Sequence, residues 1–251
     1  MTISPTACFL VTHGSRDPRS WHVLQEIVTL AQRQEPSMAI GGGCLEGLPL
    51  SLAQQLQKFG QEAQARGCDR ITIAPLFLIP GVHVSQDIPT EVAIAQKHFA
   101  TLQFQIAPHL GDRPQIPQLI QTQFERDLDP NSPSPPKKAR ILIAHGSRRE
   151  QANLPIEKLA SLVGAIAAYW SVPPSLETQI ERSIEQGAEQ IAVMPYFLAP
   201  GGITEAIASK ILTASYQTPV YLMPVPLSFS DIVSLTISSS RSAEIARLSK
   251  S

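Results

Sequence analysis

The chain has 251 residues, of which 43% are hydrophobic and 16% are charged, and its formal net charge is −1. This composition supports a sizeable core and argues against a largely disordered chain. The near-neutral charge also argues against a protein that coats nucleic acid.

The cysteine content and the apolar runs indicate the setting in which the protein works. Cys8, Cys44 and Cys68 include no C-x-x-C pair, which favours a reducing compartment. The N-terminus has no basic segment followed by a long apolar stretch, and no apolar run reaches the ~20 residues of a membrane-spanning helix. We therefore expect a cytoplasmic protein whose partners include neither membranes nor nucleic acids.

The first predicted strand leads into a distinctive turn. Residues 7–12 form an apolar run typical of a strand buried on both faces, and H-G-S-R-D follows at 13–17. Gly14 permits a tight turn, and Ser15 is a candidate N-cap for a helix predicted over about 18–34.

Strands and helices then alternate. Residues 38–45 predict a second strand, and residues 50–66 have helical spacing and stop before Gly67, a residue suited to helix C-termini. R-I-T-I-A-P at 70–75 predicts a third strand, and a further helix and a strand at 103–107 complete the pattern. Such alternation predicts a parallel sheet with right-handed crossovers.

A second copy of this pattern follows a proline-rich segment. Residues 129–138, D-P-N-S-P-S-P-P-K-K, contain four prolines and predict an extended linker. Residues 139–149 share six of eleven positions with residues 7–17, and residues 187–201 align with 67–81 without a gap. The repeat predicts further elements: strands at 140–144, 163–170, 190–195 and 220–224, and helices at about 150–162 and 175–186.

The two copies define the expected domains. We predict an α/β protein with two tandem flavodoxin-like domains, each with about four mainly parallel strands flanked by helices. The first domain comprises residues 1–128 and the second comprises residues 139–251.

Three candidate ligands follow three strands of the first half. His13, Glu46 and His83 each stand at a carboxyl end, where open α/β sheets bind their ligands. Two imidazoles and a carboxylate on one rim suit a divalent first-row metal with open coordination positions. The alternatives are that the histidines are hydrogen-bonded turn residues and that Glu46 is a solvated loop acid. For Cys44, the interpretation as a small buried strand residue is favoured over that as a fourth metal ligand. His109, at a fourth strand end, is a further candidate for the rim.

The second half keeps only part of this set. His145 matches His13, Ile203 stands in place of His83, and the alignment puts Trp170 opposite Glu46. We therefore expect one site per chain, in the first domain.

Three motifs together resemble a known family. H-G-S-R-D at 13–17, L-E at 45–46 and P-L-F-L-I-P-G-V-H-V-S-Q-D-I-P at 75–89 are similar to those of the sirohydrochlorin chelatases. These are class II, ATP-independent enzymes that insert Co²⁺ or Fe²⁺ into a tetrapyrrole. The resemblance covers the whole chain, because long members of that family carry two such halves. The P-G-x-H-x-x-x-D-I-P segment is its specific part.

The resemblance implies roles for the three candidate ligands. His13 and His83 would bind the metal and act in catalysis together with Glu46. The divalent metal would be a substrate, no organic cofactor would be needed, and the second half would be a degenerate repeat that forms a lid or a wall for the macrocycle. No nucleotide-binding motif is present.

The implied partner, sirohydrochlorin, is a polycarboxylate, which favours cations and N–H donors around the site. Ser15, Arg16, Ser85 and Arg148 are the candidates for binding it. The alternative for Arg16 is an ion pair with the neighbouring Asp17.

Several alternatives stay open at this point. Asp87 is expected to cap the helix that follows it rather than to touch substrate. The ligand types suit Co²⁺ and Fe²⁺ equally, and Ni²⁺ less well. A non-catalytic carrier of tetrapyrrole or metal is the alternative function. Because the chain contains its own pseudo-dimer partner, we expect a monomer.

Overall fold

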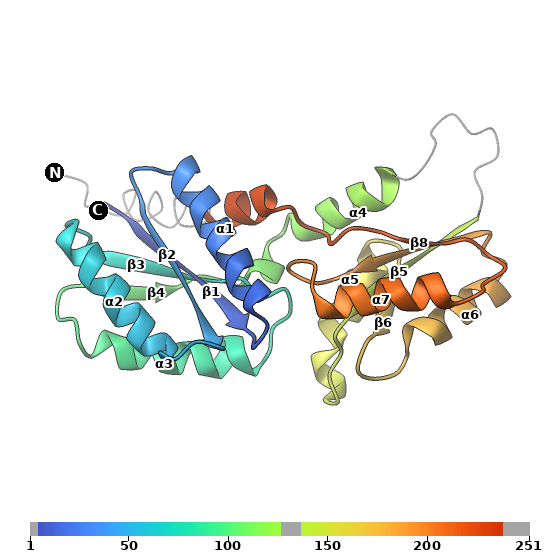
Figure 1. The fold of residues 1–251 in the computed structure, drawn as a ribbon, viewed down its shortest axis with the longest axis horizontal. Helices are drawn as coiled ribbons and strands as arrows, with labels where there is room; N and C mark the ends of the chain where they lie inside the picture. The colour runs from blue at the N-terminus through green and yellow to red at the C-terminus, as the bar shows by residue number, and fades with distance from the viewer. Residues whose placement is uncertain (1–4, 127–136, 238–251) are drawn as a thin grey trace. The chain divides into compact units, whose positions relative to one another are not determined.

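The computed structural model describes residues 5–126 and 137–237, which form two parallel four-stranded sheets with helices on their faces (Figure 1). The greater part of the expected linker lies outside the described residues, and Lys138 already belongs to a strand. No helix in the described ranges is long and apolar enough to cross a membrane.

The first sheet has the strand order β2-β1-β3-β4, as in flavodoxin-like folds. Its strands are β1 (Ala7–Gly14), β2 (Ala39–Glu46), β3 (Arg70–Pro75) and β4 (Gln103–Ile106). Its connecting helices are α1 (Pro18–Gln34), α2 (Leu52–Ala65) and α3 (Ile88–Gln96). Every pairing is parallel, so all four carboxyl ends lie on one rim, as the alternation of elements predicted.

The second sheet repeats this topology with the order β6-β5-β7-β8. Its strands are β5 (Lys138–Ala144), β6 (Ile166–Tyr169), β7 (Gln190–Pro195) and β8 (Val220–Leu222). Its helices are α5 (Leu154–Leu162), α6 (Leu176–Glu185) and α7 (Gly202–Thr213). The strand predicted over 163–170 begins later than expected. Gly164 has a φ of +66°, and the Ala165 N–H donates a hydrogen bond to the Ala160 carbonyl, so these residues terminate α5 and do not belong to the strand.

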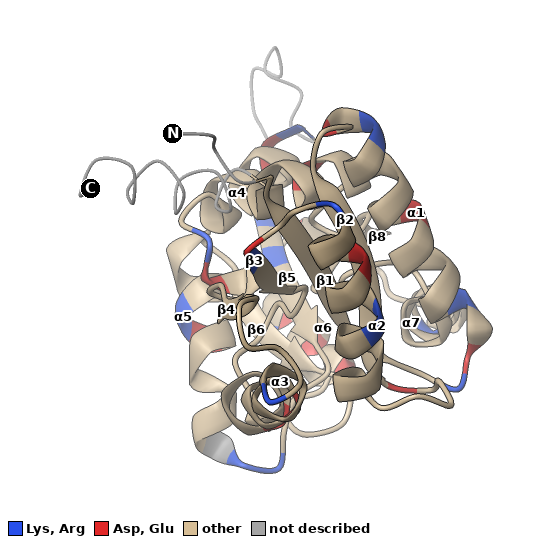
Figure 2. Ribbon diagram, turned by 90° about the vertical axis from the view of Figure 1, so that its left-hand side faces the viewer, with Lys and Arg blue, Asp and Glu red and all other residues tan. Residues whose placement is uncertain are grey.

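The core of the first unit follows the two faces of its sheet. Phe9 and Val11 of β1 pack with buried residues of α2 and α3, such as Leu56 and Ile88. On the other face, Leu24 of α1 lies against Gly42 of β2. Figure 2 shows that charged residues lie mainly on helices and loops, whereas most of the strand ribbon carries none. Strands buried on both faces read as continuous apolar runs, which is why they could be found in the sequence.

The compact units of the chain differ from its sequence repeats. One unit joins Met1–Arg113 to the segment that starts at Ser228, and the other is Pro114–Leu227. Helix α4 (Ile116–Arg126), the last of the first repeat, packs in the second unit, where the Arg140 guanidinium lies 5.4 Å from the centre of the buried Phe124 ring. The boundary at 128 therefore describes the repeat, whereas packing assigns each repeat's last helical segment to the other unit.

Candidate active site

The turn after β1 is fixed by hydrogen bonds of its own residues. Gly14 has a φ of +80°, in the left-handed region that favours glycine. His13 Nδ1 lies 2.9 Å from the Gly14 carbonyl oxygen. The Asp17 N–H donates to the Ser15 hydroxyl at 3.1 Å. The turn therefore orients the His13 ring from its Nδ1 side and leaves Nε2 pointing away from its own backbone.

The second repeat builds the same turn. Gly146 also has a φ of +80°, and His145 Nδ1 lies 3.0 Å from the Gly146 carbonyl oxygen. The Arg149 N–H donates to the Ser147 hydroxyl at 3.2 Å. The repeated H-G-S-R sequence is thus a local structural unit, and its presence twice does not by itself require two sites.

The turns after β1 and β2 interlock through glycines. A Cβ on Gly14 would lie 2.0 Å from the Glu46 carbonyl oxygen, and a Cβ on Gly47, whose φ is +85°, would lie 2.2 Å from the Ser15 carbonyl oxygen. Neither position has room for a side chain. Glycine at both positions brings the carboxyl ends of β1 and β2 together, which sets the rim where His13 and Glu46 stand.

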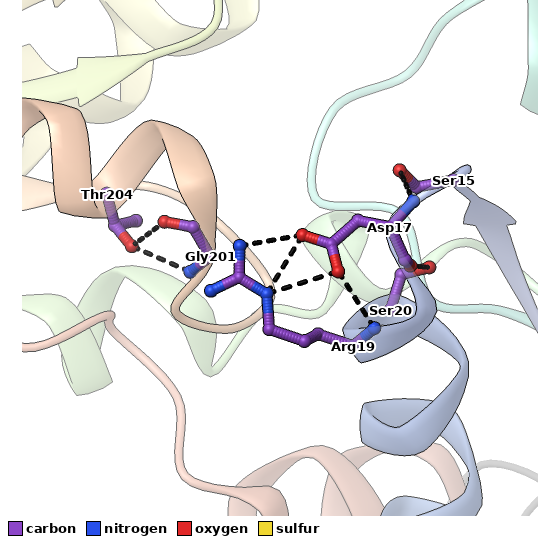
Figure 3. A network of polar contacts seen from close by, with 6 residues as sticks. All are labelled: Ser15, Asp17, Arg19, Ser20, Gly201 and Thr204. Carbon is purple, nitrogen blue, oxygen red and sulfur yellow. Dashed lines mark hydrogen bonds and ion pairs between the residues drawn. The ribbon is translucent and has the colours of Figure 1, made fainter.

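Asp17, and not Ser15, caps helix α1. Its carboxylate accepts the Arg19 N–H at 2.9 Å and forms an ion pair with the Arg19 guanidinium at 2.7 Å (Figure 3). These hydrogen bonds from Arg19 lower the pKa of the Asp17 carboxyl. The carboxylate of Asp17 thus pairs with Arg19, and the alternative for Arg16, an ion pair with Asp17, is wrong. Arg16 is exposed and has no ion-pair partner in the described part of the chain.

His13 and His83, which are 70 residues apart in the sequence, lie next to each other. His13 Nε2 is 3.1 Å from His83 Nε2. The Phe77 ring at the end of β3 lies beside both imidazoles, with its centre 6.5 Å from that of His13 and 6.3 Å from that of His83. The structure thus brings together the two histidines that the sequence singled out.

Asp87 holds the other side of the His83 ring. Its Oδ2 lies 2.7 Å from His83 Nδ1. Asp87 makes no side-chain hydrogen bond to the amino end of α3, so the expectation that it caps this helix is wrong. The sequence contained the signal, because the two residues are four apart and therefore adjacent on a helical turn.

These contacts favour one tautomer of each ring. A carbonyl oxygen and a carboxylate accept hydrogen bonds, so a proton on each Nδ1 satisfies both contacts. In that tautomer both Nε2 atoms carry a lone pair, and a cation could bind both of them across their 3.1 Å separation. If a cation bound both Nε2 atoms through metal–nitrogen bonds of ~2.1 Å, the N–metal–N angle would be about 95°. This is close to the angle between neighbouring ligands of an octahedral ion.

Glu46 stands on the same rim but does not join this pair. Strand register pairs Gly14 with Glu46, so Glu46 continues the row of Thr12 and Cys44. His13 continues the row of Phe9 and Val11 on the opposite face, because side chains alternate along a strand. Across the described residues, no group of three or more His, Cys, Asp or Glu side chains is arranged to hold a metal ion. The expected convergence of two imidazoles and a carboxylate is therefore reduced to two imidazoles.

Gln55 was missed in the sequence and holds the end of β2 in place. Its side-chain oxygen accepts the Cys44 N–H at 3.1 Å, and its amide donates to the carbonyl oxygens of Cys44 and Leu50, each at 2.9 Å. A buried polar side chain with all these partners fixes the end of β2, where Glu46 stands, to the loop that follows it. Glutamine in a helix gives no distinctive sequence signal of such a role.

Three further candidates, Cys44, His109 and Ser85, are buried or make local hydrogen bonds. Cys44 is buried, and burial raises the pKa of its thiol, which disfavours the thiolate that binds metals. His109 Nδ1 is 2.9 Å from the Phe77 carbonyl oxygen. The Ser85 hydroxyl donates to the Gly81 carbonyl at 3.0 Å.

The second repeat has lost the pair. The register of its sheet pairs Ala144 with Tyr169, as the first pairs Thr12 with Cys44. Trp170 therefore corresponds to Leu45, so the alignment of Trp170 with Glu46 was wrong by one residue. The position of Glu46 is held by Ser171, whose hydroxyl donates to the His145 carbonyl at 2.8 Å.

Comparisons with known proteins agree with the fold and the repeats. The CbiX family model matches residues 7–127 and 139–237. A sirohydrochlorin cobaltochelatase of Priestia megaterium is 21% identical over 209 residues, which cover 80% of this chain and 67% of that protein. A sirohydrochlorin ferrochelatase of the same species is 22% identical over 235 residues, which cover 90% of this chain and 85% of that protein.

A solved structure gives the same result for the fold. SirB from Bacillus subtilis with Fe³⁺ superposes with a TM-score of 0.72 and 17% identity, over 94% of this chain and 97% of that one. The two ranges that match the family model correspond to the two repeats and make up most of the chain. The chain therefore belongs to the CbiX family, and the recognition of a sirohydrochlorin chelatase from its motifs is confirmed.

Proposed function

We propose that this chain is a sirohydrochlorin chelatase that inserts Co²⁺ or Fe²⁺ at the rim of its first sheet. The observation that carries the proposal is the approach of His13 Nε2 to His83 Nε2 at 3.1 Å, with both Nδ1 atoms held by acceptors. Neutral imidazole binds both metals firmly enough to capture them and still releases them. The His83 side chain is 40% exposed, so a flat macrocycle can reach the metal.

The two histidines also account for the protons of the reaction. Insertion removes two pyrrole N–H protons, and the metal leaves two imidazole nitrogens. Each Nε2 regains its lone pair when the metal moves to the ring, and it then accepts one pyrrole proton. A dication on two neutral imidazoles and a neutral ring thus become a neutral metallated ring and two imidazolium groups. Atoms and charge balance without a further base.

Glu46 is proposed to return these protons to water. It is exposed on the same rim, and no hydrogen bond or ion pair engages its side chain within the described ranges. A carboxylate exposed on the same rim is a suitable acceptor for protons that leave two imidazolium groups. Its position on the opposite face from His13 favours this relay role over direct metal binding.

We propose that Ser15 and Arg16, on the rim of the first sheet, bind carboxylates of the substrate. For Arg148, in the matching turn of the second repeat, binding of a substrate carboxylate stays a prediction. Arg148 resembles Arg16 in being exposed, with no ion-pair partner among the described residues. Ser15 accepts a backbone N–H through its oxygen, so its own proton is free to donate. Ser85 already donates its proton to Gly81, so we assign it to the loop and not to the substrate. We also propose a cytoplasmic monomer, because one chain supplies both repeats.

The test is anaerobic incubation of the whole protein with sirohydrochlorin and either Co²⁺ or Fe²⁺ at matched free concentration, followed by absorbance. Insertion faster than the spontaneous rate supports a chelatase, and the faster metal identifies its branch of tetrapyrrole synthesis. Binding of the tetrapyrrole without any acceleration would contradict the proposal and leave the carrier function.

A further inference from the structure

We propose that Asp87 is a positioning residue that makes the histidine pair competent to bind the metal, an inference that rests on the proposed function. Asp87 does not touch the metal in this account. It acts through His83, by holding the ring and by fixing which nitrogen carries the proton.

The geometry of the contact supports this role. The 2.7 Å separation of Asp87 Oδ2 and His83 Nδ1 is that of a strong, charge-assisted hydrogen bond. A carboxylate on Nδ1 keeps the proton there, which leaves Nε2 as the metal ligand and increases its basicity. Within residues 5–126 and 137–237, His13 Nδ1 contacts a carbonyl oxygen, and Asp87 is the charged side chain that contacts the pair.

The local backbone is specialised for this contact. His83–Asp87 forms a π-helical turn, η1, in which the Ile88 N–H bonds to the His83 carbonyl, and α3 follows directly. Wide turns of this kind are rare and occur often at functional sites. In the second repeat the matching segment is an ordinary α-helix, α7, that starts at Gly202 and is capped by Thr204.

The internal repeat provides a second, independent observation. Residues 67–81 align with 187–201 without a gap, so His83 corresponds to Ile203 and Asp87 to Ile207. Ile207 is fully buried in the core of the second unit. The repeat that lacks the histidine therefore lacks the aspartate too, and an apolar residue has taken over each position. A residue needed only to shape the helix would not have to disappear together with the histidine.

The experiment is a titration of the whole, tetrapyrrole-free protein with Co²⁺, followed by the visible absorption of the bound ion. Asp87→Ala and Asp87→Asn are compared with wild type and with Asp69→Asn, which removes an exposed carboxylate before β3. We expect both Asp87 variants to bind Co²⁺ about 10–100-fold more weakly and Asp69→Asn to match wild type. Asp87→Asn should be no milder than Asp87→Ala, because its amide N–H can donate to Nδ1 and move the ring proton to Nε2.

A role confined to stability predicts a different pattern. Asp87 is 44% exposed, so both variants should fold, which circular dichroism would verify. Co²⁺ affinities within twofold of wild type, or an Asp87→Asn variant that binds like wild type, would overturn the positioning role. If wild type binds Co²⁺ and inserts it while the variants do the same, only this inference fails. If wild type itself inserts no metal, the proposed function fails.

Discussion

The imidazoles of His13 and His83 meet edge to face, with ring centres 4.5 Å apart and planes at 85°. In the proposed site the two Nε2 atoms would bind one metal ion together, so neither would be a complete site alone. We expect His13→Ala and His83→Ala each to weaken Co²⁺ binding by more than about 100-fold, since loss of a residue that only orients a ligand already costs ~10–100-fold. The double variant should lose little more than either single one. Co²⁺ titrations of the three variants measure this, and additive losses would show two independent sites.

Two glycines with the same backbone conformation separate the effect of backbone strain from that of a steric clash. Gly14 and Gly67 both have a φ of +80°, but a Cβ on Gly67 would meet nothing closer than 3.9 Å. Gly67→Ala should therefore lower the free energy of unfolding by only about 1–2 kcal/mol. Gly14→Ala should lower it by more than about 3 kcal/mol, because its Cβ would overlap the Glu46 carbonyl. Urea denaturation compares the two, and equal losses would show that the two turns do not interlock as described.

The second repeat should accept a new metal site with a single change. His145 keeps the orientation of His13, and Ile203, at the position of His83, is only partly buried. We expect Ile203→His to add a second bound Co²⁺ per chain, weaker than the first because it lacks the equivalent of Asp87. Equilibrium dialysis gives the stoichiometry, with Ile203→Gln as the matched control. A stoichiometry unchanged by the histidine would mean that the second rim differs from the first in more than its ligands.

The cysteines should be unreactive in the native protein. Cys8, Cys44 and Cys68 are buried and form no disulfide within the described residues, and burial raises the pKa of the Cys44 and Cys68 thiols. The thiolates of Cys44 and Cys68 are therefore scarcer in the folded than in the unfolded state, and the protein should lose stability as the pH rises above the ordinary thiol pKa. A thiol reagent should label none of the three at pH 8 and all three in denaturant. Fast labelling of Cys44 in the native protein would instead favour it as a ligand.

Much of the fold could be predicted because its strands are buried on both faces. The strands at 70–75 and 190–195 and the helix at 18–34 have the predicted bounds, since apolar runs and helical spacing record burial directly. The two histidines could also be predicted, because the carboxyl ends of parallel strands meet on one rim.

Other features depend on contacts that a sequence does not display. Ser15 and Asp17 are both good N-caps, and Arg19 makes the choice by binding Asp17. The alignment of the two repeats has a gap in the loop after Trp170, and only the pairing of β5 with β6 reveals its position. Asp87 has the residue type and the position of a helix cap. Its spacing of four from His83 permits their contact on a helical turn, but only the structure shows that this contact is made in place of the cap. The exchange of the last helical segment between units likewise leaves the repeat pattern unchanged.

One measurement tests most directly the claim that the chain has a single active site, built on His13 and His83. Sirohydrochlorin and Co²⁺ would be incubated anaerobically with wild type, His83→Ala and His145→Ala, and insertion would be followed by absorbance. The account predicts acceleration by wild type, no acceleration by His83→Ala, and a rate close to wild type for His145→Ala. Loss of activity in both variants would contradict a single site on the first sheet, and full activity of His83→Ala would remove the histidine pair from the reaction.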